Sequence, residues 1–118
     1  MGKRKIAIVI VLVIILGTTA QATGPLKAPR AEPYLEFSDN VATCIAKVSG
    51  YGKTDKIYVT MRLWGNGTCL RTWVASRTER VTLEKTAYAS RGKTYTLTID
   101  YTINGVKQTQ RATTKTYV

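Results

Sequence analysis

This chain of 118 residues has no histidine, only two cysteines, three prolines and seven acidic residues. The absence of histidine removes the commonest metal ligand and the commonest general base, and the two cysteines are not at the C-x-x-C spacing of a zinc site. We therefore expect no metal and no cofactor. Most of the few acids fall in predicted turns or on solvent-facing strand positions, and no catalytic signature is present, so the sequence predicts a protein that is not an enzyme.

Only one long apolar run is present, Ile6 to Leu16, and it is shorter than the roughly 20 residues of a membrane span. It follows basic Lys3-Arg-Lys5 and precedes Ala20-Gln-Ala22, which reads as an A-x-A cleavage site. This order predicts a signal peptide over 1–22 and a mature chain from Thr23; the alternative is an uncleaved membrane anchor. We expect a secreted protein, free or held non-covalently at the cell surface, that meets the membrane only during export.

Acidic residues are outnumbered, because the full chain has 18 Lys and Arg against seven Asp and Glu. Removal of residues 1–22 leaves 15 basic residues and a formal net charge of +8. Such a charge favours binding to extracellular polyanions, for example wall teichoic polymers, anionic lipid headgroups or acidic glycans. We expect no intracellular nucleic acid partner. The alternative is that the cations serve solubility, because they lie singly or in near pairs beyond the signal peptide; the oligomeric state is left open.

Cys44 and Cys69 are the only cysteines, in a chain predicted to enter an oxidising compartment. The even number predicts one disulfide between them. It would close a loop of about 25 residues and stabilise the fold by roughly 3–4 kcal/mol. The alternative is a pair of buried thiols in a host whose exported proteins avoid disulfides.

All three prolines lie at or before Pro33, and with Gly24 they predict an extended linker over 23–33. From Tyr34 onward Thr, Val, Ile and Tyr dominate, and turn signals recur along the chain. We expect a single domain over 34–118, an all-β, small antiparallel β-sandwich of about six to seven strands and of immunoglobulin-like size. A partly open β-barrel is the alternative.

Two segments alternate between apolar and polar residues with the period of a strand that has one wet face. The residues predicted to point inward are Ile57, Val59, Met61 and Leu63 in 57–64, and Tyr95, Leu97, Ile99, Tyr101 and Ile103 in 95–103. Weaker strands are predicted at 41–49, 69–76, 80–88 and 106–117, the last polar enough to be an edge. Gly65-Asn66-Gly67 and Asn104-Gly105 predict hairpin turns.

The first hairpin yields the one candidate binding face. A turn centred on Asn66-Gly67 pairs Trp64 with Cys69 and Met61 with Thr72. The outward residues form a basic and aromatic face suited to sugar rings or an anionic polymer: Tyr58, Arg62, Trp64, Arg71 and Trp73. Arg62 and Arg71 would then be opposed like charges, tolerable if the indoles cover them. In the alternatives, the Trp residues are packing, or a bulged loop turns Cys69 and Trp73 inward. The bulged register is the less favourable one, because it would also push Arg71 into the core.

One further pattern joins core and turn positions across about residues 40–103. It consists of Ala42-x-Cys44-x-Ala46-x-Val48-x-Gly50, Ile57-x-Val59-Thr60-Met61-x-Leu63, Trp73, Lys85-x-x-Tyr88, Gly92-x-x-Tyr95 and Tyr101. This pattern resembles a family of small secreted β-rich proteins of Gram-positive bacteria with no assigned function. The resemblance implies a Gram-positive host and a β-sandwich, and it implies no catalytic or binding residue.

Together these features predict a secreted, non-catalytic binding or adhesion module for anionic cell-wall, glycan or surface components. The alternative is a cationic secreted antibacterial effector, bacteriocin-like, that acts on membranes. The sequence favours the binding module, because the charges lie on predicted strands and not on an amphipathic helix of the membrane-surface type.

Overall fold

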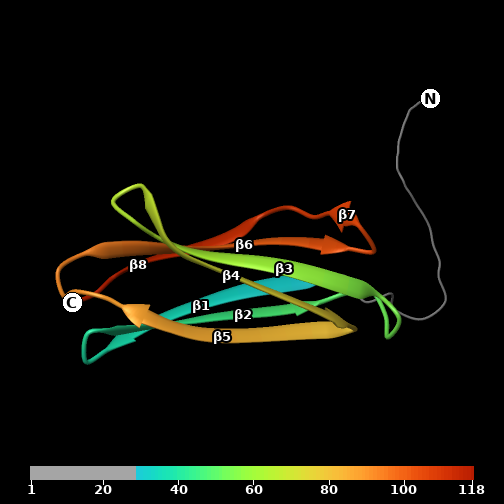
Figure 1. Cartoon of the computed structure of the whole chain (residues 1–118), viewed down its shortest axis with the longest axis horizontal. Helices are drawn as coiled ribbons and strands as arrows, with labels where there is room; N and C mark the ends of the chain where they lie inside the picture. The colour runs from blue at the N-terminus through green and yellow to red at the C-terminus, as the bar shows by residue number, and fades with distance from the viewer. Residues whose placement is uncertain (1–28) are drawn as a thin grey trace.

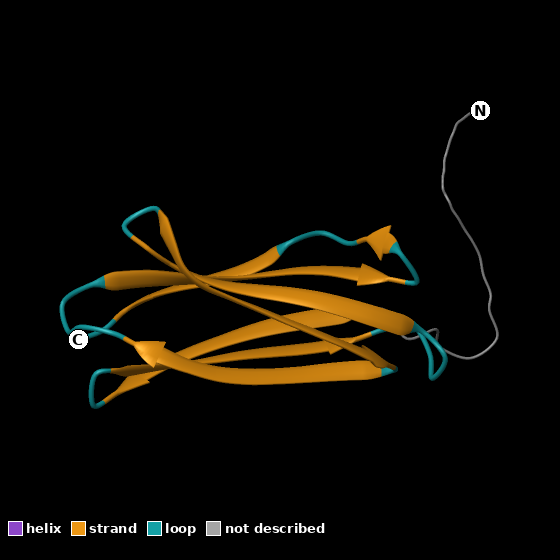
Figure 2. Cartoon of the chain, in the orientation of Figure 1, coloured by secondary structure: helices purple, strands orange, loops and turns teal. Residues whose placement is uncertain are grey.

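A computed structural model describes residues 29–118, in which every regular element is a β-strand (Figure 2). The strands are β1 Arg30–Ser38, β2 Val41–Ser49, β3 Lys56–Gly65, β4 Thr68–Thr78, β5 Arg80–Tyr88, β6 Thr94–Ile103, β7 Val106–Lys107 and β8 Arg111–Thr116. The predicted signal peptide, 1–22, lies outside the described residues. Within residues 29–118, no helix is long and apolar enough to cross a membrane.

The strands form two antiparallel sheets that face each other (Figure 1). Sheet A has the order β1-β2-β5, and sheet B has the order β4-β3-β6-β7 with β8 also paired to β6. The chain passes from sheet B to sheet A through a single residue, Glu79, which joins β4 to β5 at a positive φ of 72°. The predicted all-β sandwich is thus confirmed, and the sheets do not close into a barrel.

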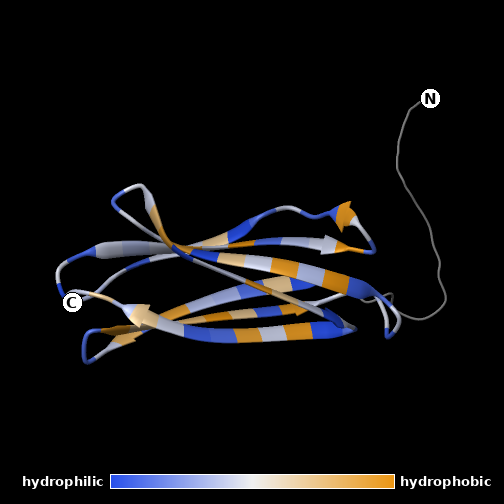
Figure 3. Ribbon diagram, in the orientation of Figure 1, coloured by the Kyte–Doolittle hydropathy of each residue, from blue (hydrophilic) through white to orange (hydrophobic). Residues whose placement is uncertain are grey.

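The core lies between the sheets, and the two predicted alternating segments line it. All the residues predicted to point inward from 57–64 and 95–103 are buried. Figure 3 shows the resulting alternation of apolar and polar bands along β3 and β5. Because each buried aliphatic side chain of this size contributes roughly 1.5–3 kcal/mol, this alternation is the main reason the strands hold their faces.

Three hairpin turns have two successive residues with positive φ, the signature of type I′ turns. They are Asp39-Asn40, Asn66-Gly67 and Asn104-Gly105. The second and third are the predicted hairpins. The first was not predicted, although Asp and Asn tolerate this conformation better than other residues with a side chain.

A loop between β2 and β3 is held to the neighbouring β6–β7 turn by Asp55. Its Oδ2 accepts hydrogen bonds from the Tyr51 and Gly52 amides at 2.6 and 3.1 Å, and its Oδ1 accepts one from Asn104 Nδ2 at 3.0 Å. The Asn104 bond, followed by the backbone bonds, lowers the pKa of Asp55. Gly50 is required beside it, because a Cβ there would lie 2.9 Å from Asp55 Cβ.

Two boundaries differ from the prediction. β1 begins at Arg30, inside the predicted linker, because Ala31 is buried in the core and Pro33 is tolerated on an edge strand. The predicted strand 106–117 is two short strands separated by residues 108–110. Its predicted position at an edge is correct, since β8 is the last strand beside β6.

Candidate functional site

The β3–β4 hairpin does not keep one register, and this divides the predicted binding face. Trp64 is opposite Cys69, as predicted, but a bulge between Leu63 and Trp64 shifts the pairing of the rest of the hairpin by one residue. Met61 is therefore opposite Trp73, not Thr72. The prediction that Arg71 and Trp73 share a face with Tyr58, Arg62 and Trp64 is wrong. The bulged alternative describes the hairpin better, except that Cys69 stays exposed.

The shifted register costs less than the sequence suggests, because β4 is the edge strand of sheet B. Arg71 is opposite core residue Leu63, yet it is exposed at the sheet margin, where its Nη1 donates a hydrogen bond to the Leu70 carbonyl at 3.1 Å. Trp73, two residues on, is half-buried and packs against the core. The shift therefore gains apolar packing for an indole without burying a guanidinium.

On the outer face of β3, the polar groups of Arg62 and Trp64 are bonded within sheet B. Arg62 Nη1 forms an ion pair with Asp100 Oδ2 at 3.0 Å, and Trp64 Nε1 donates to Thr98 Oγ1 at 3.0 Å. The indole lies against β6, where Thr98 is only 8% exposed. Tyr58 remains 49% exposed. This face, which we call the outer face, is consequently neutral at its centre.

Threonines fill much of the outer face beside these residues. On β6 and β8 they pair across strands, with Oγ1–Oγ1 distances of 2.7 Å for Thr94–Thr116 and 2.9 Å for Thr96–Thr114. Such cross-strand hydroxyl pairs stabilise a sheet. We interpret these bonds as structural, because they engage the hydroxyls with one another.

The other half of the predicted face lies along the open side of the sandwich. Arg71, Trp73 and Arg77 occupy alternate positions on the core-facing side of edge strand β4, and Lys85 occupies the core-facing side of edge strand β5, opposite Cys44. The three cations are exposed. We call these four residues the basic margin. Arg77 and Lys85 were missed by the sequence analysis, and the period-two spacing from Arg71 to Arg77 is the signal that points to Arg77.

The cations of the basic margin have no acidic partner among residues 29–118. The ion pairs in this region join Arg30 to Glu32, Arg62 to Asp100 and Arg80 to Glu79. Fourteen Lys and Arg face seven acids in the same range, so most cations there are left for other partners. The basic margin differs from these other cations because Arg71 and Arg77 lie on the same side of one strand, with the Trp73 indole between them.

The predicted Cys44–Cys69 disulfide is not present, since both cysteines are free. Cys44 lies on the core-facing side of β2 in sheet A, while Cys69 is exposed at the start of β4 in sheet B. Cys69 Sγ instead lies 3.4 Å from Thr72 Oγ1. Burial raises the pKa of the Cys44 thiol to about 11, so it stays protonated at neutral pH. Burial also raises the pKa of Tyr101, against the opposing charge of Arg111.

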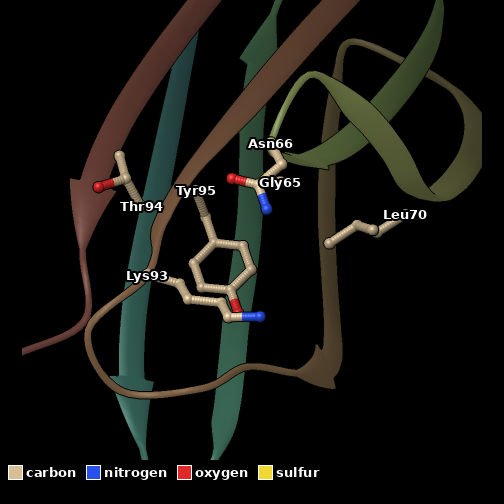
Figure 4. Close-up of a pocket in the computed structure, with 6 residues that line it drawn as sticks. All are labelled: Gly65, Asn66, Leu70, Lys93, Thr94 and Tyr95. Atoms are coloured by element: carbon tan, nitrogen blue, oxygen red, sulfur yellow. The ribbon is translucent and has the colours of Figure 1, made fainter.

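A small hollow of about 100 Å³ lies between the β3–β4 turn and the start of β6. Figure 4 shows the Tyr95 ring at its centre, with Lys93 beside it and Asn66 and Leu70 on the opposite side. The Tyr95 hydroxyl accepts a hydrogen bond from the Ser90 amide at 2.9 Å. The hollow is smaller than the roughly 300–1,000 Å³ of typical ligand pockets, so an extended surface is the stronger candidate.

Residues 29–118 contain no group of three or more His, Cys, Asp or Glu side chains placed to hold a metal ion. No protein-family model matches this chain, and a search of curated proteins also finds no match. The candidate site is therefore assigned from its geometry, four residues on two edge strands. Three are cations that have no acidic partner within residues 29–118, and one is a half-buried tryptophan.

Proposed function

We propose that this protein is a secreted, non-catalytic binding module, and that the basic margin holds an anionic component of a cell wall, glycan or cell surface. The observation that carries the proposal is the row Arg71, Trp73 and Arg77 on edge strand β4, with exposed Lys85 on the core-facing side of edge strand β5. None of these three cations has an acidic partner within residues 29–118. Export and a Gram-positive host remain part of this proposal, on the basis of the signal peptide predicted over 1–22 and the family resemblance.

Two differences between the basic margin and the outer face support placing the binding site at the basic margin. Arg62 is paired with a carboxylate and Arg71 is not, so only Arg71 can bind an external anion without first losing a partner. Trp73 also places an aromatic ring on the same side of β4 as Arg71 and Arg77, so a ligand bound there would contact apolar and charged groups together.

The proposal is tested by the triple variant Arg71→Gln, Arg77→Gln, Lys85→Gln, assayed for binding to purified wall teichoic acid and to heparin. Each exposed charge contact is worth about 0.5 kcal/mol, so the three together should weaken binding about ten-fold at low salt. Added salt should weaken binding by the native protein more than by the variant, because exposed charges are screened.

A matched control variant removes three positive charges outside the basic margin: Lys53→Gln, Lys107→Gln, Lys115→Gln. These three residues are also exposed, and none belongs to an ion pair within residues 29–118. If net charge alone governed binding, both triple variants would lose equally, and the basic margin would not be a site. Leakage of anionic lipid vesicles at concentrations that do not bind teichoic acid would instead support the membrane-acting effector.

A further inference from the structure

The open edges of the two sheets are not protected equally. β1 contains Pro33 between Glu32 and Glu36, and proline and charge both oppose the addition of another strand. β8 is only six residues long. β5 carries adjacent opposite charges, Glu84 and Lys85, at its middle. Each of these three edges thus has a feature that discourages pairing with another chain.

β4 is protected by the bulge at its hairpin end and by charge of one sign only, at Arg71 and Arg77, which an acidic partner would neutralise. It is the longest strand, with 11 residues, and it contains neither proline nor an acidic residue. None of its residues is buried, and Val74 is 55% exposed within the apolar run Trp73-Val74-Ala75. An edge strand presents a row of unpaired backbone N–H and C=O groups to a partner. A long, exposed and partly apolar edge of this kind is the sort to which extended peptides add in β-augmentation.

We propose that β4 binds an extended acidic polypeptide segment as an additional strand of sheet B. This inference rests on the proposed function, because it uses cations of the basic margin, and it names an acidic polypeptide as one of the anionic surface components that they bind. Backbone hydrogen bonds to β4 would supply affinity, and side chains at alternate positions would supply specificity. The partner supplies acids because the cations of β4, Arg71 and Arg77, have no acidic partner within residues 29–118.

The spacing within β4 fixes the pattern of the partner. Arg71, Trp73, Ala75 and Arg77 alternate on one side of the strand, so an added strand places every second residue next to them. A complementary seven-residue segment has acids at its first and seventh positions and β-branched apolar residues at its third and fifth. This pattern reads the same in both directions, so it fits β4 whether the added strand is parallel or antiparallel.

The charges on β4 disfavour a second copy of this chain as the added strand. Antiparallel pairing of two β4 strands about Val74 would place Arg71 of one copy opposite Arg77 of the other, twice in each dimer. Like charges directly opposed across strands are destabilising. An acidic partner converts the same two positions into attractive pairs.

The test uses the mature protein and a peptide with glutamate at positions one and seven, valine at three and five, and threonine between them. A control peptide of identical composition has its glutamates at positions two and six, which places them on the opposite side of the strand from the valines. We expect the first peptide to bind at least about five-fold more tightly. We also expect it to slow hydrogen exchange of amides in β4 and not of amides in β8.

The variant Arg71→Gln, Arg77→Gln should lose that preference, while Lys107→Gln, Lys115→Gln keeps it. Equal binding of both peptides, or binding without amide protection in β4, would overturn strand addition. If teichoic acid still binds through the basic margin in that case, the proposed function stands and only this inference fails. Protection of β4 amides in a peptide-free dimer would also overturn it, because the occupant would then be a second copy.

Discussion

Two pairs of arginine and tryptophan lie on the β3–β4 hairpin, and they differ in what their polar groups contact. On the outer face, Arg62 is bonded to Asp100 and Trp64 to Thr98, both on β6. On the basic margin, the Arg71 guanidinium donates to the neighbouring Leu70 carbonyl and has no acidic partner within residues 29–118, and the Trp73 ring packs against the core. The same residue types thus stabilise sheet B on the outer face and remain available to a ligand on the basic margin.

The difference follows from position in the sheet. β3 lies between β4 and β6, so side chains on its outer face have neighbours on both sides. β4 has a neighbour on one side only, and its cations Arg71 and Arg77 are exposed. An arginine at an edge keeps its charge available, whereas one on a central strand finds a carboxylate. The following predictions test this contrast.

The largest expected difference concerns the two thiols. Cys69 lies opposite Trp64 and is exposed, whereas burial raises the pKa of Cys44 from 9.0 to about 11. Because the thiolate is the reactive form, a shift of this size lowers its fraction about 100-fold. Cys69 should therefore react with a thiol reagent at pH 8 at least 100-fold faster, as measured by mass spectrometry on Cys44→Ser and Cys69→Ser. A native mass two hydrogens lower, with no free thiol, would restore the disulfide prediction.

Trp73→Ala should cost about 2 kcal/mol of unfolding free energy, less than a fully buried tryptophan would, because the ring is half-buried against the core. Urea unfolding measures it, with Leu70→Ala as the control at an exposed site of the same strand. A cost below 0.5 kcal/mol, within the usual range for surface substitutions of about ±0.5 kcal/mol, would mean that the predicted register, with Trp73 outward, is the correct one.

Trp64→Ala should cost about 1 kcal/mol, since it removes the hydrogen bond to Thr98 and uncovers that residue. It should leave the affinity for teichoic acid unchanged. Trp64→Phe keeps most of the ring and isolates the hydrogen bond. A several-fold loss of affinity in Trp64→Ala, with Trp73→Ala unaffected, would reverse our assignment of the two faces.

The smallest effect is expected from Asp100→Asn, which removes the partner of Arg62 and leaves its charge free. The outer face should then become weakly basic, and retention on heparin should rise about two-fold, as one exposed charge is worth about 0.5 kcal/mol. Arg62→Gln in the same background should cancel the gain. No change in retention would show that pairing with Asp100 is not what neutralises the outer face.

Local patterns were sufficient to predict most of the fold. The alternation of Ile57 through Leu63 and the Asn104-Gly105 turn depend on neighbours in sequence, and both predictions are confirmed. The β4 register depends on a balance between distant parts of the molecule. The sequence analysis rejected the bulge because it would bury Arg71, and nothing in the sequence shows that β4 is an edge where Arg71 escapes burial.

The candidate site was harder to predict for the same reason. Asp100 lies on a strand 38 residues away from Arg62 in sequence, so their ion pair follows only from the β3–β6 pairing. Lys85 joins the basic margin because β5 is the edge of the other sheet. Both relations are consequences of strand order, which alternation does not encode. The register inferred from the hairpin turn therefore brought together five residues that the shifted register divides between the two faces of sheet B.

One measurement separates the two surfaces directly, because the chain has two tryptophans, one on each. Their indole N–H groups give two signals in an ¹⁵N–¹H correlation spectrum, assigned with Trp64→Phe, and teichoic acid is titrated into the mature protein. We predict that the Trp73 signal shifts with saturation while the Trp64 signal, held by Thr98, stays in place. A saturating shift of the Trp64 signal with an unmoved Trp73 signal would contradict the assignment of binding to the basic margin.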